Sequence, residues 1–419
     1  ERREIIERLQ MLPVKVRTVP SLEEIVEGEA VVDAIRPIAI EDLLGRDPVD
    51  PRQDLLDRCI RGKVVLVTGA GGSIGSELCR QIVRLAPEKL ILLERSEFAL
   101  YSIHQELLAG LNDVAHPPEV LPILGSAGDR SHVSAVMADF DIDTVYHAAA
   151  YKHVPLVEYN VASGIMNNAI ATHVIAQAAI DHGVSSFVLV STDKAVRPTN
   201  VMGASKRLAE LVLQALHGRG SSTRFCMVRF GNVLDSSGSV VPRFKEQIES
   251  GGPITVTDPE VIRYFMTIPE AAGLVIQAGS MGTGGDVFLL DMGDAVRIAD
   301  LARLMIRLAG LTERTDARRR GDIEIRYTGL RPGEKLYEEL LIGDAPMSTE
   351  HPMIMRANES ELPWEELHAR LVELEGACRD SDVGRIRELL EQTVEGFSPD
   401  QDIADLAWLA RIADQSAVT

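Results

Sequence analysis

Short apolar runs alternate with amphipathic helical stretches along most of the chain from Lys63 onward. The runs are rich in β-branched and aliphatic residues, and each ends at small or polar residues typical of a turn. Buried parallel strands have this character, because helices cover both faces of their sheet. The predicted strands are KVVLVTG, KLILLER, VLPILGS, TVYHAAA, SSFVLVS, RFCMVRFGN and, later in the chain, DVFLLD. The pattern predicts an α/β fold with a doubly wound parallel sheet.

Changes in this pattern predict the domain boundaries. The main sheet domain is expected at 61–232, and the segment 286–310, which begins with the DVFLLD run, is expected to return to it. Between and after these segments the rhythm of strands and helices breaks into loop-rich stretches. We expect 233–285 and 311–345 to form a smaller α/β domain that faces the ends of the strands.

The two ends of the chain have a different character. Residues 346–419 are expected to be a C-terminal helical extension, with a pair of helices at 361–392. Residues 1–60 contain a polar helix at 1–10 and a short strand at 14–19, too little to bury a core of their own. We expect this region to be an arm, or the remnant of a preceding domain.

Charge narrows the range of partners. The chain has 419 residues, of which 45% are hydrophobic, and this is enough to form a large buried core. Its 63 acidic and 43 basic residues give a net charge of −20, which repels nucleic acid and anionic membranes. The basic run ARRRG at 317–321 is short and is interpreted as a solvated loop. We therefore expect no nucleic acid partner.

The cysteines show no paired spacing, so neither a metal site nor a disulfide framework is predicted, and a cytoplasmic location is expected. They are Cys59, Cys79, Cys226 and Cys378. No apolar run is long enough to span a bilayer, and no signal-peptide pattern is present. Because the sequence begins at Glu1 and the first methionine is Met11, we expect that an upstream part is missing.

A glycine-rich turn follows the first predicted strand. In VVLVTGAGGSIGSELCRQI, Gly69, Gly72 and Gly75 are spaced as G-x-x-G-x-x-G, and Ser73 and Ile74 begin the next helix. The glycines permit a tight turn, close approach of a pyrophosphate, and packing of helix on strand. The helix N-terminus directs amides at the phosphates. This context predicts that 61–232 is a dinucleotide-binding Rossmann domain.

The next strands supply the walls of the expected cofactor site. Glu94 ends the second strand about twenty residues after the glycines, where a carboxylate accepts both hydroxyls of an adenosine ribose and favours NAD. Arg95 and Ser96 follow and can contact a 2′-phosphate, so NADP remains the less favoured alternative. Further wall residues are expected after the third and fourth strands, unless these serve only ordinary packing: Asp129, Arg130, Ala148 and Ala149.

The segment STDKAVRPTNVMGASK carries the candidate chemistry. Thr192, Asp193 and Lys194 follow a buried strand, at the edge where doubly wound sheets bind ligands. Lys206 lies one helical turn after Met202, on the same helix face. Asp193 and Lys194 are adjacent groups of opposite titration behaviour, which suits acid and base catalysis; a surface ion pair in a loop is the alternative.

Several stretches together resemble the UDP-N-acetylglucosamine 4,6-dehydratases, extended short-chain dehydrogenases of bacterial surface-glycan synthesis. They are the glycine turn, AAAYKHVPLVEYN, STDKAVRPTNVMGASK, RFGNVLDSSGSVVPRF and GLRPGEKLYEELL, within about 31–345. The long, membrane-associated branch, in which methionine replaces the catalytic tyrosine at the position of Met202, is especially similar. The resemblance implies a missing N-terminal membrane region, a place at the cytoplasmic face of the inner membrane, and a homo-oligomer.

The resemblance also implies a reaction. The sugar is oxidised at carbon 4, water is eliminated across carbons 5 and 6, and the hydride returns to carbon 6, giving a UDP-4-keto-6-deoxy-N-acetylhexosamine. Asp193 is then the acid and must be buried or near another acid, while Lys194 is the base and must be desolvated or near Lys206. Thr192 is expected to hold the carbon 4 hydroxyl. Its proton acceptor is left open among Lys194, Asp193 and a water held by Lys206.

The substrate, UDP-N-acetylglucosamine, has its own expected contacts. Arginine suits a diphosphate because its planar fork makes paired hydrogen bonds, and a glutamate can accept the uridine ribose hydroxyls. Any one of these residues taken alone can equally be structural. The expected substrate residues are Lys152, Asn168, Asn232, Val240, Pro242, Arg263, Arg331 and Glu334.

Two other functions remain open at this point. A nucleotide-sugar 4-epimerase shares the scaffold, but it has no use for the Asp193 and Lys194 pair. A dinucleotide-binding sensor without catalysis is suggested by Met202, because a thioether cannot accept a proton.

Overall fold

The computed structural model describes residues 17–18, 36–37, 49–112, 114–317, 319–339, 346–399 and 401–418. The chain divides into two compact units. The larger unit contains Val49–Gly231, Ile268–Asp291 and Arg331–Thr419, and the smaller unit contains Asn232–Thr267 and Met292–Leu330. The helix predicted at 1–10 lies outside the described residues, as does most of the strand predicted at 14–19. Within that strand Arg17–Thr18 forms β1, which pairs antiparallel with β2 (Arg36–Pro37).

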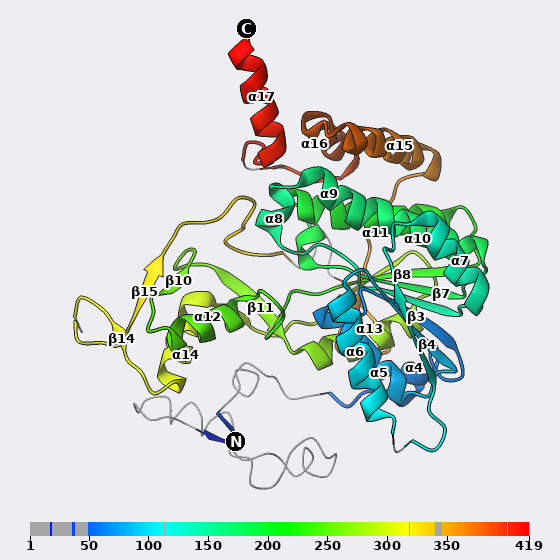
Figure 1. Ribbon diagram of the computed structural model, residues 1–419, viewed down its shortest axis with the longest axis horizontal. Helices are drawn as coiled ribbons and strands as arrows, with labels where there is room; N and C mark the ends of the chain where they lie inside the picture. The colour runs from blue at the N-terminus through cyan, green and yellow to red at the C-terminus, as the bar shows by residue number, and fades with distance from the viewer. Residues whose placement is uncertain are drawn as a thin grey trace. The chain divides into compact units, whose positions relative to one another are not determined.

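The larger unit is built on a sheet that, in the described part of the chain, has nine strands in the order β16-β17-β12-β8-β7-β6-β3-β4-β5 (Figure 1). All seven predicted strands are present and parallel, which confirms the doubly wound α/β fold. Two short antiparallel strands extend the edge beyond β12. The strands are β3 (Val64–Thr68), β4 (Lys89–Glu94), β5 (Glu119–Leu124), β6 (Thr144–His147), β7 (Ser186–Val190), β8 (Arg224–Arg229), β12 (Asp286–Leu290), β16 (Met347–Ser348) and β17 (Ile354–Ala357). The chain order reverses between β3 and β6, and such a reversal opens a crevice at the strand ends.

Helices cover both faces of this sheet. One face carries α4 (Gln53–Asp57), α5 (Ser73–Arg84), α6 (Glu97–Gly110) and α13 (Ile268–Met281). The other carries α7 (Arg130–Phe140), α8 (Val154–Glu158), α9 (Val161–Ile165), the π-helical turn η1 (Met166–Ile170), α10 (Ala171–Asp181) and α11 (Val201–Gly218). The expected boundaries assigned 268–285 to the smaller domain, whereas α13 packs on α4 and α5 in the larger unit. They also placed 292–310 with the main sheet and 331–339 in the smaller domain, whereas 292–310 lies in the smaller unit and 331–339 in the larger one.

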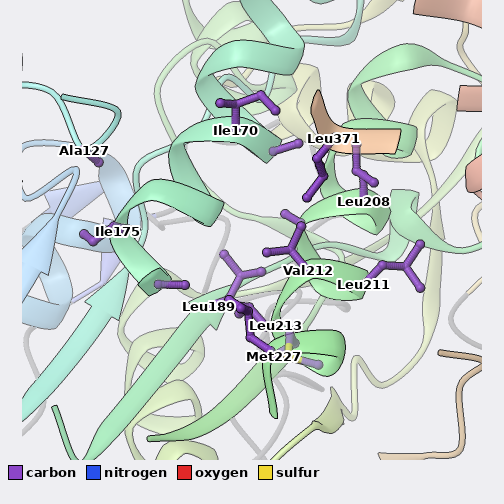
Figure 2. Close-up of a cluster of buried hydrophobic side chains, with 14 of the residues drawn as sticks. Ala127, Ile170, Ile175, Leu189, Leu208, Leu211, Val212, Leu213, Met227 and Leu371 are labelled. Carbon is purple, nitrogen blue, oxygen red and sulfur yellow. The ribbon is translucent and has the colours of Figure 1, made fainter. Parts of the chain in front are cut away.

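Helix α11 is buried on all sides, because a further layer covers it. From Val201 to Leu216 its residues are buried, a pattern typical of a helix inside a core rather than on a surface. Figure 2 shows Leu208, Leu211 and Val212 in one apolar cluster with Leu189 of β7 and with Leu371. Leu371 belongs to the predicted C-terminal pair of helices, α15 (Trp364–Asp380) and α16 (Val383–Thr393), which packs on α9 and α11. A last helix, α17 (Leu406–Val418), follows.

The smaller unit contains two short sheets among its described residues. In one, β10 (Ile254–Val256), β15 (Ile323–Tyr327) and β14 (Glu313–Arg314) are parallel; in the other, β11 (Ile262–Met266) pairs with β9 (Asn232–Val233) and β13 (Ala295–Arg297). The helices α12 (Val240–Glu249) and α14 (Ile298–Leu308) pack on each other and on β10. The mixed α/β character expected for this part of the chain is therefore present.

A candidate dinucleotide-binding and catalytic site

The glycine turn between β3 and α5 leaves no room for side chains. Gly69 has a positive φ of 64°, and a Cβ atom there would lie 2.8 Å from the Cα of Ala149. A Cβ atom at Gly75 would lie 1.9 Å from the carbonyl oxygen of Gly69, so the helix packs directly against the turn. Gly72 caps the N-terminus of α5. Such a turn leaves backbone amides at a helix N-terminus open to a phosphate.

A cavity of about 490 Å³ opens beside this turn, at the carboxyl ends of β3, β4 and β6. Small residues line much of it, as the passage of an extended ligand requires. The predicted cofactor residues that line it are Gly69, Gly72, Glu94, Arg95, Ser96, Ala148 and Ala149. Six others lie outside the lining and stay predictions: Ser73, Ile74, Gly75, Asp129, Arg130 and Lys206, which was expected to hold the nicotinamide ribose. The side chain of Asp129 instead caps α7, accepting the backbone N–H of His132 at 3.1 Å.

Glu94 is fixed at the rim of the cavity by backbone donors. Its Oε2 atom accepts the N–H of Gly71 at 3.1 Å, and its Oε1 atom accepts the N–H of Ser96 at 2.9 Å. Sequence reasoning missed Gly71, although the repeated glycine in GAGG was a signal. A Cβ atom there would lie 2.5 Å from the Cβ atom of Ala99 on α6, so only glycine lets the turn reach Glu94.

Arg95 is engaged by an aromatic residue that sequence reasoning did not single out. Its guanidinium lies over the ring of Tyr151, 5.3 Å from the centroid, and donates to the Tyr151 hydroxyl. It also donates to the Asn167 side-chain oxygen at 3.4 Å. All three residues line the cavity, so this cluster bounds it between the ends of β4 and β6.

A buried histidine supports the wall of the cavity. His147 Nδ1 lies 2.6 Å from the hydroxyl of Thr68, which lines the cavity, and Nε2 lies 3.0 Å from the hydroxyl of Thr172. Burial, aided by the charge of Lys206, lowers the pKa of His147 to about 3. Its imidazole is therefore neutral, and it links β3, β6 and α10.

The free energy of unfolding is expected to fall by about 2 kcal/mol between pH 7 and pH 5 because of His147 alone. The unfolded chain binds a proton on this ring below about pH 6.5, whereas the folded chain does so only near pH 3, so this contribution is present above pH 6.5 and is lost as the pH falls. Urea unfolding at both pH values measures it. A His147→Asn variant with the same pH dependence as the wild type would refute the assignment.

Three consecutive side chains at the end of β7 form the candidate catalytic group. Thr192 donates its hydroxyl proton to Asp193 Oδ1 at 2.8 Å, and Lys194 Nζ donates to the same oxygen at 3.0 Å. Asp193 is 2% exposed, and its Oδ2 atom is buried without a hydrogen-bond partner among the described residues. One carboxylate oxygen is thus fully engaged, while the other can accept a proton without breaking these bonds.

Lys206 and Met202 lie on the first turns of α11. Lys206 donates to the carbonyl oxygen of Val190, the last residue of β7, at 2.8 Å. Burial lowers the pKa of Lys206 to about 8, although the charge of Glu210 opposes the shift. Met202 is 2% exposed and belongs to the apolar cluster between α11 and the sheet. A packing role therefore accounts for the thioether.

Replacement of Met202 by leucine is expected to lower turnover by no more than about tenfold, because swaps that conserve volume cost below about 1.5 kcal/mol. Thr192→Val removes a hydroxyl bonded to Asp193 and is expected to cost about a hundredfold. Steady-state kinetics of the two variants test this contrast. If Met202→Leu is inactive and Thr192→Val is active, Met202 rather than Thr192 is needed for turnover, and the two roles have been assigned the wrong way round.

A buried charge network lies behind the catalytic group. Glu210 on α11 accepts from the Ser191 hydroxyl at 2.6 Å and from Arg229 Nε at 2.8 Å. Arg229 Nη1 donates to Glu359 at 2.5 Å, and Arg207 pairs with both glutamates. The four side chains are at most 4% exposed. Because Ser191 precedes Thr192, the network ties α11, β8 and the segment after β17 to the end of β7.

The RPGEK part of the motif GLRPGEK, residues 331–335, docks on the catalytic segment within the larger unit. Asn200 donates to the carbonyl oxygen of Gly333 at 2.9 Å, and Lys335 Nζ donates to the carbonyl oxygens of Val196 and Arg197 at 3.2 and 2.8 Å. Glu338 follows, with Oε1 3.6 Å from Lys194 Nζ. Sequence reasoning missed Glu338, because nothing local in the sequence indicates this long-range pair.

The predicted substrate residues fall in both units. In the larger unit, Asn168 is 1% exposed and bonds to the backbone of Tyr151, so it has a structural role there. Lys152 is exposed. Arg331 and Glu334 contact each other, because the backbone N–H of Arg331 donates to the Glu334 carboxylate. The smaller unit holds Asn232, Val240, Pro242 and Arg263. A joint substrate site formed by these residues stays a prediction.

Two kinds of feature, a membrane-spanning helix and a cluster of metal ligands, are absent from the described residues. No helix there is both long and apolar enough to cross a bilayer. No cluster of three potential metal ligands occurs in the same part of the chain.

The fold and the glycine turn define a dinucleotide-binding protein of the extended short-chain dehydrogenase class, as the sequence motifs predicted. The chain belongs to the polysaccharide biosynthesis protein family, whose model matches residues 65–359. It is 52% identical over 328 residues to the capsular polysaccharide biosynthesis protein CapD of Staphylococcus aureus, covering 78% of this chain and 53% of that protein. It is 46% identical to the probable polysaccharide biosynthesis protein EpsC of Bacillus subtilis, covering 85% of this chain and 61% of EpsC. The chain thus spans little more than half the length of these relatives.

More distant similarities include an epimerase and a dehydratase. A UDP-glucose 4-epimerase of Rickettsia canadensis is 32% identical, covering 67% of this chain and 77% of the epimerase. The crystal structure of Pen from Bacillus thuringiensis matches with a TM-score of 0.61 and 30% identity, covering 75% of this chain and 98% of Pen. A dTDP-glucose 4,6-dehydratase of Streptomyces venezuelae, solved with NAD bound, matches with a TM-score of 0.56 and 20% identity, covering 78% and 99%. The last similarity concerns the fold alone.

Proposed function

We propose that this chain carries the catalytic site of a UDP-N-acetylglucosamine 4,6-dehydratase. The observation that supports this most directly is the arrangement of Asp193 and Lys194, bonded to each other at 3.0 Å at the end of β7. A proton donor and a proton acceptor side by side suit an elimination, in which one proton is given to the leaving group and another is removed. The relatives named for polysaccharide biosynthesis, together with the UDP-glucose 4-epimerase of Rickettsia canadensis, support a nucleotide-sugar substrate.

The cofactor that fits the cavity is NAD. Gly69, Gly72 and the N-terminus of α5 would hold its diphosphate, and Lys206 its nicotinamide ribose. Glu94, held by two backbone amides, presents a carboxylate where the adenosine ribose would lie, which disfavours a 2′-phosphate. When bound, NAD supplies the oxidation at carbon 4 and the reduction at carbon 6.

The residues of the chain move the remaining protons. Lys194 donates to Asp193 in the structure, and transfer of that proton along the bond gives a carboxylic acid beside a free amine. Asp193 then gives its proton to the hydroxyl leaving carbon 6, while Lys194 takes the proton from carbon 5. Thr192 orients the carbon 4 hydroxyl. The elimination thus returns the pair to the ion-paired form. The carbon 4 hydroxyl releases one proton on oxidation and carbon 5 takes up one proton when the hydride reaches carbon 6, so the whole cycle conserves protons.

The substrate separates the competing functions. Incubation with UDP-N-acetylglucosamine is expected to give a 4-keto product, which is detected by its absorbance in alkali. Formation of UDP-N-acetylgalactosamine in place of the keto product would establish a 4-epimerase. Binding of the UDP-sugar without any product would establish a sensor. The purified chain is also expected to retain NAD, which can be assayed in the supernatant after denaturation.

We also propose that the reaction takes place in the cytoplasm, in a homo-oligomer at the inner face of the bacterial membrane. The four cysteines are free and buried, as in a reducing compartment. Light scattering of the purified chain measures its oligomeric state.

A further inference from the structure

The side chain of Lys194 lies between two carboxylates that come from distant parts of the chain. Asp193 Oδ1 is 3.0 Å from its Nζ atom, and Glu338 Oε1 is 3.6 Å from it. The Glu338 side chain is 4% exposed and that of Lys194 is 19% exposed. Pairs this well shielded from water interact more strongly than surface pairs.

The segment that carries Glu338 is fastened to the catalytic segment at both ends. Lys335 binds the carbonyl oxygens of Val196 and Arg197, and Glu339 pairs with Arg197 at 3.4 Å. Gly333 has a positive φ of 71°, and a Cβ atom there would lie 2.5 Å from the Cβ of Asn200. Glu338 is therefore held toward Lys194 mainly by the bonds of Lys335 and the close packing at Gly333, because the Glu339 pair is exposed and contributes little.

We propose that Glu338 is the positioning residue of Lys194: it orients the amine and stabilises the ammonium that forms as Lys194 removes the carbon 5 proton. This inference rests on the proposed function. As Lys194 becomes positive, a fixed carboxylate nearby stabilises the developing charge, as a buried aspartate does for the histidine of a serine protease triad.

The charge of Glu338 also affects how turnover depends on pH. The reactive form of the Asp193 and Lys194 pair holds one proton, so activity falls when the pair gains a second proton or loses its only one. The negative charge of Glu338 favours the more protonated form of the pair, so loss of that charge is expected to move the pH profile to lower pH. The packed elements carry these other charged or titratable groups: Lys206, Arg207, Glu210 and His217 on α11, Glu158 on α8, and Arg197, Arg331, Glu334, Lys335, Tyr337 and Glu339 in the two segments.

Glu338→Gln is expected to shift both limbs of the pH profile of kcat to lower pH by about one unit and to lower the maximum at least about tenfold. Glu338→Asp keeps the charge, so its limbs are expected to stay within a few tenths of a unit of the wild type while its maximum falls. The neighbouring Glu339→Gln is the matched control, because Glu339 is exposed and pairs with Arg197 rather than Lys194. Its profile is expected to match that of the wild type.

A Glu338→Gln profile that coincides with the wild-type profile would overturn the proposal. If Glu338→Gln does not fold, a Glu338→Asp variant whose maximal kcat equals that of the wild type would also overturn the proposal. A second measurement does not need turnover: the rate at which acetic anhydride acetylates Lys194, followed by mass spectrometry across pH, reports the pKa of the amine. If the wild type makes no keto product, the proposed dehydratase function fails. Glu338 is then judged by this pKa alone, which falls in Glu338→Gln if the inference is right and stays unchanged if it is wrong.

Discussion

Replacement of Asp193 by asparagine is expected to lower the rate of dehydration by a factor of about 10²–10⁴, the range found for a positioned proton donor. Asparagine preserves the shape of the side chain, and its oxygen can still accept from Thr192 and Lys194, as Asp193 Oδ1 does at 2.8 and 3.0 Å. It cannot deliver a proton to the leaving hydroxyl. Release of the 4-keto product measures the rate, and calorimetric binding of the UDP-sugar is the control expected to be unchanged.

Lys194→Ala separates the base from the acid in the same assay. Incorporation of solvent deuterium at carbon 5 requires the base, so it is expected to be lost in Lys194→Ala at every pH. In Asp193→Asn the Lys194 amine cannot pass its proton to residue 193, so incorporation is expected to return only as the pH is raised. Dehydration is expected to be abolished in Lys194→Ala as well. Near-normal turnover in either variant would show that the acid and base have been assigned to the wrong side chains.

Glu210→Gln is expected to lower the free energy of unfolding by about 3–5 kcal/mol, the cost of leaving a buried charge without its partner. Burial alone would raise the pKa of Glu210, but the charges of Arg229 and Arg207 lower it to about 2, so the folded protein contains the carboxylate. Its removal leaves two buried guanidiniums, of Arg229 and Arg207, to share the single carboxylate of Glu359, so one buried positive charge is uncompensated. Urea unfolding measures the loss.

An exposed pair provides the control for this measurement. Glu391 pairs with Arg387 at 3.2 Å on the surface of α16, and Glu391→Gln is expected to stay within about 1 kcal/mol of the wild type. Equal effects of the two substitutions would mean that the buried network contributes no more than a surface ion pair.

The sequence was sufficient for features that depend on local pattern. Each parallel strand appears as one continuous apolar run, and the turn at Gly69 has the residue spacing that its geometry demands. The edge strands β16 and β17 were missed, because two to four residues are too few to show a period. The last helix, α17, was included only within a general helical extension.

The sequence does not reveal which side chains interact when they are far apart along the chain. Glu338 reaches Lys194, and Glu359 reaches Arg229, only because the chain returns to the end of β7 and to α11 after leaving the sheet. Arg331 and Glu334 were interpreted as ligand residues from their charge, but they are close enough in sequence to interact with each other. Charge alone does not reveal whether a residue will meet a ligand or a neighbour.

Thr192, Asp193 and Lys194 are consecutive residues, and the strand before them is buried in the middle of a sheet. No hinge separates their Cα atoms, so the backbone positions of the proposed proton donor and acceptor are set by the end of β7. Under the proposed mechanism, substitutions elsewhere in the chain would change the sugar that is accepted and leave this pair undisturbed.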